Sequence, residues 1–412
     1  MTSAPGPGRR TLEAVFRAAL AATAGEYCVA DQLAAQPLSG PVSVIALGKA
    51  ASAMALGSAS ALGAELQRGL VITKQGHIPP RLLEDRRFAS LEAGHPLPDS
   101  GSLAAGQALL GFIAATPPGE QLLFLISGGT SSLVEVPLEG VGLDELVRLN
   151  HWLLGSGLDI AAMNRLRCAV SAIKGGKLLQ HLGDRPATVM LISDVPGDDP
   201  AIIGSGLLMP PDGTRRLPTG LPDWVRQLVQ GDDSYCRVPT AQPAVAHHIV
   251  ARLQDALQAA AREARKRGYE ATLVDAALHG DATTAGGQIA EFLRRQGPGI
   301  WLWGGETTVC LPEQPGRGGR NQSLALAAAV ALQDHADCTL LAAGTDGTDG
   351  PTDAAGAIID GGTVARGGGR QAALEALRHA DAGSFLDASG DLLVTGPTGT
   401  NVTDLVIGLK TR

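Results

Sequence analysis

Short apolar runs that end in polar, glycine-rich loops recur along the chain and predict its architecture. Each run has the length of a strand, and the runs occupy residues 42–47, 69–73, 122–126, 188–193, 300–303, 339–343 and 392–395. Helical stretches separate the runs, and this alternation is typical of a parallel sheet with helices on both faces. Ligands of such sheets bind beyond the carboxyl ends of the strands, so the polar loops are the candidate binding regions.

A Pro- and Gly-rich stretch at residues 209–240 carries few long apolar runs and indicates a boundary between two α/β domains. The hydrophobic pattern predicts an amphipathic helix at 11–24 and a long helix at 245–267, with His247 and His248 on its surface. We expect the domains to be residues 1–240 and 241–412, with the active site in the cleft between them.

Composition restricts the class of protein. The 412 residues carry a net charge of -8 and show no basic stripe interleaved with aromatic residues, so no nucleic-acid partner is expected. The five cysteines are far apart and form no CxxC pair, which argues against a disulfide framework and a structural zinc. There is no apolar signal segment and no uncharged run long enough to span a bilayer, so we expect a cytoplasmic protein with no membrane partner.

The loop at 127–132 follows an apolar run directly and combines two glycines with four hydroxyl side chains. Backbone N–H groups and the N-terminus of a following helix would favour a phosphate or a carboxylate there. A glycine turn whose hydroxyl residues cap the next helix explains the pattern equally well. The candidate binding residues are Ser127, Gly128, Gly129, Thr130 and Ser131.

A second candidate is the stretch at 163–176. Its polar residues are spaced 3, 4 and 3 apart and would share one face of a helix: Asn164, Arg167, Ser171 and Lys174. A polar, basic face with no balancing carboxylate suits an anion, although a solvated outer face is the ordinary alternative.

Acidic residues follow the run at 188–193. Asp194, Asp198 and Asp199 suit Mg²⁺ binding or a base for a hydroxyl group, and Ser205 lies in a glycine-flanked turn nearby. A simple turn explains Asp198 and Asp199 well but explains Asp194 less well.

The second half offers two comparable loops. A Gly-rich loop before an Ala/Leu-rich helix contains Arg317, Arg320 and Asn321. The planar guanidinium groups suit a phosphate, so we favour a phosphate-binding loop over an ordinary basic surface loop. Asp346, with Asp349 and Asp353, could hold a metal or orient a hydroxyl group, the alternative being a tight acidic turn.

Lys49 comes just after the run at 42–47, in a loop that lacks the GxxxxGK[ST] pattern of a Walker A motif. A lysine at this position could contact a transferred phosphate or a substrate carboxylate. His77 and His95 each follow a glycine and could be loop ligands to a substrate.

Several strings, in order from about Val44 to the C-terminus, closely resemble the glycerate kinases that carry a MOFRL domain: ALGKAA, GLVITKQGH, GHPLPDS, LISGGTSS, NRLRCAVSAIKGGKL, ISDVPGDDP, GGETTV, GRGGRNQSLALA, GTDGTDGPTDAAGA and TGPTGTNVTDL. The resemblance implies a Rossmann-like N-terminal domain, a C-terminal MOFRL domain and catalysis in the cleft between them. It also implies phosphoryl transfer from MgATP to D-glycerate, usually giving 2-phosphoglycerate, with Lys49 and Arg320 as the strongest catalytic candidates.

On this hypothesis Lys49 and Arg320 neutralise the transferring phosphoryl group, and Asp194 holds Mg²⁺ or orients the glycerate 2-hydroxyl. The 127–132 loop would bind nucleotide phosphates or the glycerate carboxylate. The remaining binding candidates are Asn164, Arg167, Lys174, Ser205, Glu306, Asn321 and Asp346, of which Asp346 is also a metal candidate.

Two other functions remain open. A hydroxypyruvate reductase would need a dinucleotide site, and no GxGxxG follows a predicted strand with an acidic residue about 20 positions on. A non-catalytic sensor of sugar acids is the second alternative. A homodimer is compatible with the sequence, which does not decide between the 2- and 3-hydroxyl as acceptor.

Overall fold

The computed structural model describes residues 6–210, 217–229 and 245–412, which form two compact units. One unit is Gly25–Ala251, and the other joins the start of the chain, as far as Ala24, to Arg252–Arg412. The boundary predicted at residue 240, and most of the stretch predicted to contain it, fall outside the described residues.

The unit Gly25–Ala251 is built on a six-stranded sheet in the order β3-β2-β1-β4-β5-β6, with every neighbouring pair parallel. Its strands are β1 Val42–Leu47, β2 Leu66–Lys74, β3 Phe88–Ala93, β4 Gln121–Ile126, β5 Ala187–Ile192 and β6 Val245–Ala251. The sheet confirms the predicted α/β class. Its central strands are buried because helices cover both faces, which is why they read as continuous Val, Ile and Leu runs.

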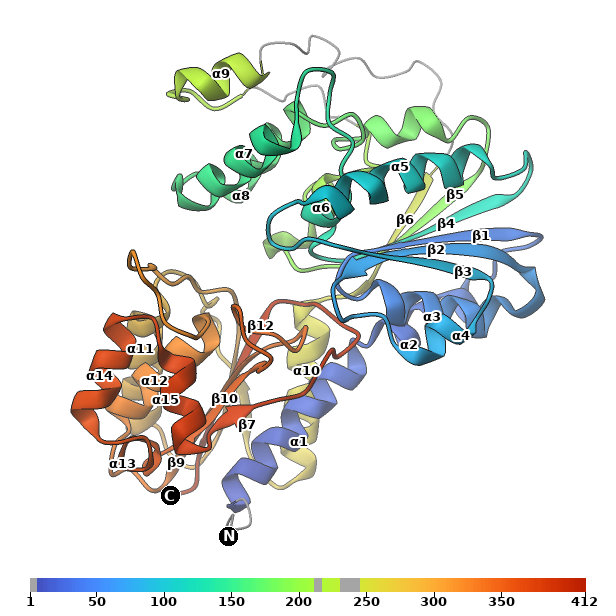
Figure 1. The fold of residues 1–412 in the computed structure, drawn as a ribbon. Coiled ribbons are helices and arrows are strands. Elements are labelled where there is room, and N and C mark those ends of the chain that lie inside the picture. Colours follow the sequence, from blue (N-terminus) through green and yellow to red (C-terminus); the bar gives the residue numbers. More distant parts are fainter. Residues whose placement is uncertain (1–5, 211–216, 230–244) are drawn as a thin grey trace. The chain divides into compact units, whose positions relative to one another are not determined.

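Helices α2 and α3 lie on one face of this sheet and α5 lies on the other (Figure 1). The helices of the unit are α2 Gly25–Ala35, α3 Ala51–Leu62, α4 Pro80–Glu84, α5 Ser100–Ala114, α6 Thr130–Leu133, α7 Leu143–Gly155, α8 Ile160–Ala169 and α9 Asp223–Val229. Helices α7, α8 and α9 share a small apolar core of their own, to which Leu146, Leu166 and Val225 belong.

The helix predicted at 245–267 is wrong in its first third. Val245–Ala251 is strand β6, which pairs with β5, and helix α10 begins at Leu253. Three β-branched residues in this segment and a free edge of the sheet favour the strand over a helical turn. His247 and His248 therefore lie on the edge strand.

The second unit has a mixed sheet in the order β11-β10-β9-β12-β8-β7, in which only the β7–β8 pair is parallel. Its strands are β7 Ala271–Leu273, β8 Gly299–Gly305, β9 Cys338–Gly344, β10 Gly356–Asp360, β11 Leu392–Leu393 and β12 Asp404–Lys410. Its helices are α1 Pro7–Ala22, α10 Leu253–Lys266, α11 Ala282–Arg295, α12 Arg320–Ala331, α13 Thr363–Arg366, α14 Arg370–Arg378 and α15 Ala382–Ser389.

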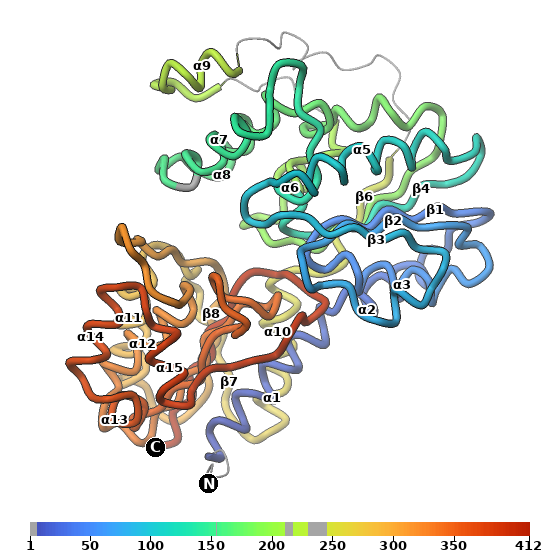
Figure 2. Tube along the Cα trace, viewed as in Figure 1, coloured from blue at the N-terminus to red at the C-terminus, as the bar shows by residue number. Residues whose placement is uncertain are grey.

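The predicted first helix belongs to this second unit. Helix α1 packs beside α10, the helix that opens the C-terminal part of the chain (Figure 1, Figure 2). Four residues that the pattern placed on its apolar stripe are buried there, Leu12, Val15, Phe16 and Ala19, and Leu20 is partly buried. The second unit therefore contains both ends of the chain, and no single boundary in the sequence separates the two units.

Helix α5 contains two glycines that should respond oppositely to alanine. A methyl group on Gly106 would lie 2.1 Å from the carbonyl oxygen of Glu135, whereas nothing lies within 4 Å of one on Gly111. Gly106→Ala should therefore destabilise the protein by about 1–3 kcal/mol through overpacking. Gly111→Ala should stabilise it by about 0.5–1 kcal/mol because alanine loses less backbone entropy in a helix. Urea unfolding of both variants tests the contrast, and equal effects would contradict the close approach of α5 to Glu135.

Candidate functional site

The loops that follow β1 and β4 meet at the point where the strand order reverses. Strand β1 leads on to β2 on one side and β4 leads on to β5 on the other, and such a reversal opens a crevice beyond the carboxyl ends. The N–H group of Lys49 donates to the carbonyl of Gly128 at 2.9 Å, and that of Ala50 donates to Ser127 Oγ at 3.0 Å. Each loop therefore fixes the other.

Ser127 and Thr130 hold this arrangement together and are buried. Ser127 Oγ donates to the carbonyl of Leu47 at 3.3 Å, and Thr130 Oγ1 donates to the carbonyl of Ser127 at 2.7 Å. Helix α6, which follows, is only four residues long, so its dipole contributes little to binding an anion. The predicted contribution of a helix N-terminus to anion binding is therefore small, and backbone N–H groups of the loop remain as the candidate donors.

Gly129 lies between the side chains of Lys49 and His95. Its φ is 87°, and a Cβ atom there would lie 3.1 Å from Lys49 Cγ and 3.2 Å from His95 Cδ2. Only glycine combines this left-handed backbone with so close an approach. The glycine thus lets two side chains of different loops, one basic and one imidazole, reach the same point.

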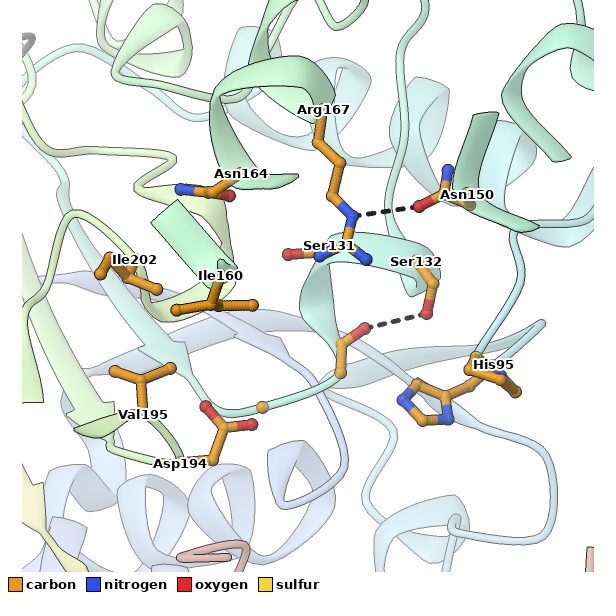
Figure 3. Close-up of a pocket in the computed structure, with 14 residues that line it drawn as sticks. His95, Ser131, Ser132, Asn150, Ile160, Asn164, Arg167, Asp194, Val195 and Ile202 are labelled. Carbon is orange, nitrogen blue, oxygen red and sulfur yellow. Dashed lines mark hydrogen bonds between the residues drawn. The ribbon is translucent and has the colours of Figure 1, made fainter. Parts of the chain in front are cut away.

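A cavity of about 180 Å³ opens beside this point (Figure 3). Pockets for drug-sized ligands span roughly 300–1,000 Å³, so this one suits a molecule of a few heavy atoms. Its polar lining includes Ser131, Ser132, Asn150, Asn164, Arg167 and Asp194. Gly128, Gly129 and His95 also line it, so seven of the predicted residues meet here: His95, Gly128, Gly129, Ser131, Asn164, Arg167 and Asp194.

Arg167 brings a positive charge to this cavity. Its guanidinium group extends from α8 toward Ser131 and Ser132 (Figure 3), and Nε donates to Asn150 Oδ1 at 3.1 Å. Among the described residues no carboxylate forms an ion pair with it. Burial lowers the pKa of Arg167, and the attraction of Cys168 and Glu135 offsets that effect only in part. A partly buried guanidinium group without an ion pair favours an anionic ligand.

The predicted helical stripe of Asn164, Arg167, Ser171 and Lys174 does not form. Helix α8 ends at Ala169, because the chain beyond it bridges to another segment: Ser171 pairs with Pro137, and the N–H of Ala172 donates to the carbonyl of Val136 at 2.7 Å.

The expectation that no carboxylate balances this stretch is also wrong. Lys174 is 1% exposed and forms an ion pair with Glu135, which is 2% exposed. The structure therefore leaves Arg167 at the cavity and places Lys174 in a buried pair behind it.

Asp194 and Ser205 approach the cavity from the loops after β5. Asp194 lines it (Figure 3), whereas Ser205 is fully buried and shares a 2.6 Å hydrogen bond between its Oγ and that of Ser131. The φ of Ser205 is 60°, a strained backbone for a residue with a side chain. Asp199 accepts from the N–H of Ala201 at 2.9 Å, as the turn alternative for that residue expects.

The second unit has a charged cluster centred on Arg320, the first residue of α12. Its Nε and Nη2 atoms contact both carboxylate oxygens of Asp404, at 2.5 and 3.0 Å, and Nη1 lies 2.7 Å from Glu306 Oε1. Burial opposes the charged form, but the attraction of Asp404, Glu306 and Asp349 outweighs it and raises the pKa of Arg320. Asp404 is 1% exposed, so it fixes the guanidinium group from inside the protein.

Asp349 occupies the N-terminus of α12. Its Oδ1 accepts from the N–H of Asn321 at 3.1 Å and its Oδ2 from that of Gln322 at 2.8 Å. Burial, together with repulsion by Asp404, raises the pKa of Asp349 to about 7. The helix end that the sequence offered to a phosphate is therefore capped by the protein's own carboxyl group, and Asp346 likewise accepts from the N–H of Thr348 at 3.0 Å.

The described residues include no cluster of three or more His, Cys, Asp or Glu side chains that could hold a metal ion by themselves. In the part of the chain that the structure covers, no helix has the length and apolarity needed to cross a membrane. The sequence missed Asn150, Glu135 and Asp404 as site residues. Of these, only Asp404 carried a signal, since it lies in the string TGPTGTNVTDL.

Comparison with known proteins finds matches that cover both units. Residues 11–219 match the domain of unknown function DUF4147, and residues 299–404 match the MOFRL family. The D-glycerate 2-kinase of Thermotoga maritima is 37% identical, with 89% of this chain and 90% of that protein covered. An Agrobacterium vitis protein whose name provisionally assigns it a hydroxypyruvate reductase activity is 36% identical, with 96% and 93% covered. The crystal structure of glycerate kinase from Thermotoga maritima matches with a TM-score of 0.80 at 33% identity, covering 98% of this chain and 100% of that one.

Proposed function

The chain belongs to the family that joins a DUF4147 domain to a MOFRL domain, and from this premise we propose that it is a glycerate kinase. It transfers the γ-phosphoryl group of ATP to D-glycerate and forms 2-phosphoglycerate and ADP. The observation that carries the proposal is the small cavity in which the unneutralised guanidinium group of Arg167 lies across from the carboxylate of Asp194. A three-carbon hydroxy acid has the matching groups, an anionic end and hydroxyl groups.

In this assignment Arg167 binds the carboxylate of glycerate, and the hydroxyl groups of Ser131 and Ser132 hydrogen-bond to the same molecule. Asp194 orients the acceptor hydroxyl group and accepts its proton as the oxygen bonds to the γ-phosphorus and the bond to ADP breaks. Lys49, held against Gly129 beside the cavity, neutralises charge on the transferring group.

We assign Arg320 of the second unit to the same reaction. Phosphoryl transfer depends on positioning and on charge stabilisation, and a guanidinium group fixed by Asp404 and Glu306 is held in one orientation for that role. Asn321, next to Arg320, belongs to the same nucleotide-binding segment in this proposal.

Carboxylate oxygens fit Mg²⁺ that arrives bound to ATP. Magnesium usually keeps several waters and binds through one or two carboxylates together with substrate phosphates, so a three-residue protein cluster is not needed. Asp194 in the first unit and Asp346 in the second are each candidates to hold it. The ion would screen the phosphate charges and orient the transferring group.

A coupled product assay tests the proposal. Purified protein, MgATP and D-glycerate are incubated with enolase and no phosphoglycerate mutase. Rapid formation of phosphoenolpyruvate is the expected result, because enolase acts on 2-phosphoglycerate. Phosphoenolpyruvate that appears only after mutase is added would move the product to the 3-isomer, and the absence of ADP would sink the kinase assignment.

The same preparation distinguishes the reductase alternative. The loop after β1 reads Gly48-Lys49-Ala50-Ala51 and lacks the glycine pattern that approaches a dinucleotide pyrophosphate. We therefore expect no NADH or NADPH oxidation with hydroxypyruvate. Oxidation at a rate comparable to ADP formation would favour the reductase.

A further inference from the structure

Asn150 of α7 holds Arg167 by one edge. Its Oδ1 accepts from Arg167 Nε at 3.1 Å, and its Nδ2 donates to the carbonyl of Leu146, one turn earlier, at 2.9 Å. Asn150 is 7% exposed, so neither bond competes freely with water. Both hydrogen-bonding ends of the amide are therefore engaged, and the amide is fixed in orientation.

This contact leaves the other edge of the guanidinium group for a ligand. A guanidinium group has five N–H donors, and the bond to Asn150 uses only the one on Nε. The terminal nitrogens extend between Ser131 and Ser132 (Figure 3). A pair of such nitrogens matches the two oxygens of a carboxylate in a bidentate contact.

Behind Arg167 lies a buried carboxylate, Glu135, that has partners of its own. Glu135 raises the pKa of Arg167, but its Oε2 contacts Lys174 Nζ and its Oε1 accepts from Ser171 Oγ at 2.5 Å. Arg167 is therefore held on one side by the neutral amide of Asn150, which we call the tether, and the carboxylate behind it, Glu135, is already paired with Lys174. Arg167 is only partly buried, so its guanidinium group can reach a ligand in the cavity without first giving up an ionic partner.

We propose that Asn150 is a positioning residue that orients Arg167 without neutralising it, and that it thereby sets the affinity of the cavity for the carboxylate of a small hydroxy acid. The proposal rests on the proposed function for the identity of that acid, D-glycerate. It concerns ligand binding, so it predicts a change in KM for glycerate and little change in the chemical step.

Three variants test the charge of the tether. Asn150→Asp places a carboxylate against Arg167 and should raise KM for glycerate at least about tenfold, because an internal ion pair competes with the ligand. Asn150→Ala removes the tether without adding charge and should raise it less. His151→Asp adds the same charge at the exposed neighbouring position of α7 and should change KM by less than about twofold.

Measurements of kcat, KM for ATP and unfolding distinguish a role of Asn150 in positioning Arg167 from a role in stabilising the fold. We expect kcat and KM for ATP to stay within about threefold of wild type in Asn150→Asp, and all three variants to unfold cooperatively. Equal KM for Asn150→Asp and Asn150→Ala, or a fall in kcat with KM unchanged, would overturn the proposal. If Asn150→Asp does not fold, Asn150→Ala against Asn150→Gln decides it, because only the second keeps a neutral acceptor.

Direct binding distinguishes failure of this inference from failure of the kinase assignment. D-glycerate binding is measured by calorimetry without nucleotide, in wild type and in Asn150→Asp. A wild-type enzyme that binds D-glycerate but does not phosphorylate it would refute the kinase while leaving the tether testable. If wild type does not bind D-glycerate, the same comparison with tartronate, malonate and lactate decides, and a cavity that binds none of them overturns the inference.

Discussion

Replacing Lys49 by alanine is expected to lower kcat for glycerate phosphorylation at least about 100-fold, the scale seen when one donor to a transition state is removed. The side chain of Lys49 lies against Gly129 beside the cavity, and its backbone is tied to Gly128 across the two loops. A charge fixed in this way is aligned before the reaction begins, which is the condition for a large electrostatic contribution. Because its backbone N–H bond does not depend on the side chain, the fold should survive the change.

The measurement is steady-state kinetics with D-glycerate and MgATP, together with a thermal melt. Lys266→Ala, at the exposed C-terminal end of α10, is the matched control and should retain wild-type activity. Lys49→Arg keeps the charge but not the geometry, so its kcat should fall between those of Lys49→Ala and wild type. A Lys49→Ala enzyme within about threefold of wild type would remove this lysine from the mechanism.

Much of the fold was predictable because the first unit is a parallel sheet. Strands buried on both faces appear in the sequence as uninterrupted apolar runs, so β1 was predicted at its observed bounds and β4 began one residue earlier than predicted. The edge strand β6 was mistaken for helix because its residues are only half-buried and pair with one neighbour. Residues 245–251 include His247 and His248 and so form no continuous apolar run. Their strand conformation is recognisable only from their pairing with β5.

The candidate site was predictable where a residue follows a strand and not where it comes from another segment. Lys49, Gly129 and Asp194 each lie just beyond a strand, so the rule for ligand sites in parallel sheets found them. Lys174 was assigned to the same face as Arg167 by helical spacing, but the helix ends before it and Glu135, 39 residues earlier, takes its charge. Partners so distant in sequence leave no periodic signal.

Replacing Arg320 by alanine should lower kcat at least about 100-fold and should also destabilise the protein, unlike the change at Lys49. Asp404 is 1% exposed, and it would lose the guanidinium group that contacts both its oxygens. Breaking a fully buried pair costs roughly 3–5 kcal/mol. The Arg320 side chain is 34% exposed, so solvent screening should reduce the loss to about 1–2 kcal/mol.

A second substitution separates these two effects. Arg320→Ala combined with Asp404→Asn removes the uncompensated charge, so it should recover part of the stability while kcat stays at least about 100-fold below wild type. Arg378→Ala, whose exposed ion pair with Glu375 lies within α14, is the control for loss of an arginine and should change neither quantity appreciably. Kinetics and urea unfolding of the four proteins, wild type included, give both quantities. If the double variant regains activity along with stability, Arg320 serves to neutralise Asp404 and not to stabilise the transferring phosphoryl group.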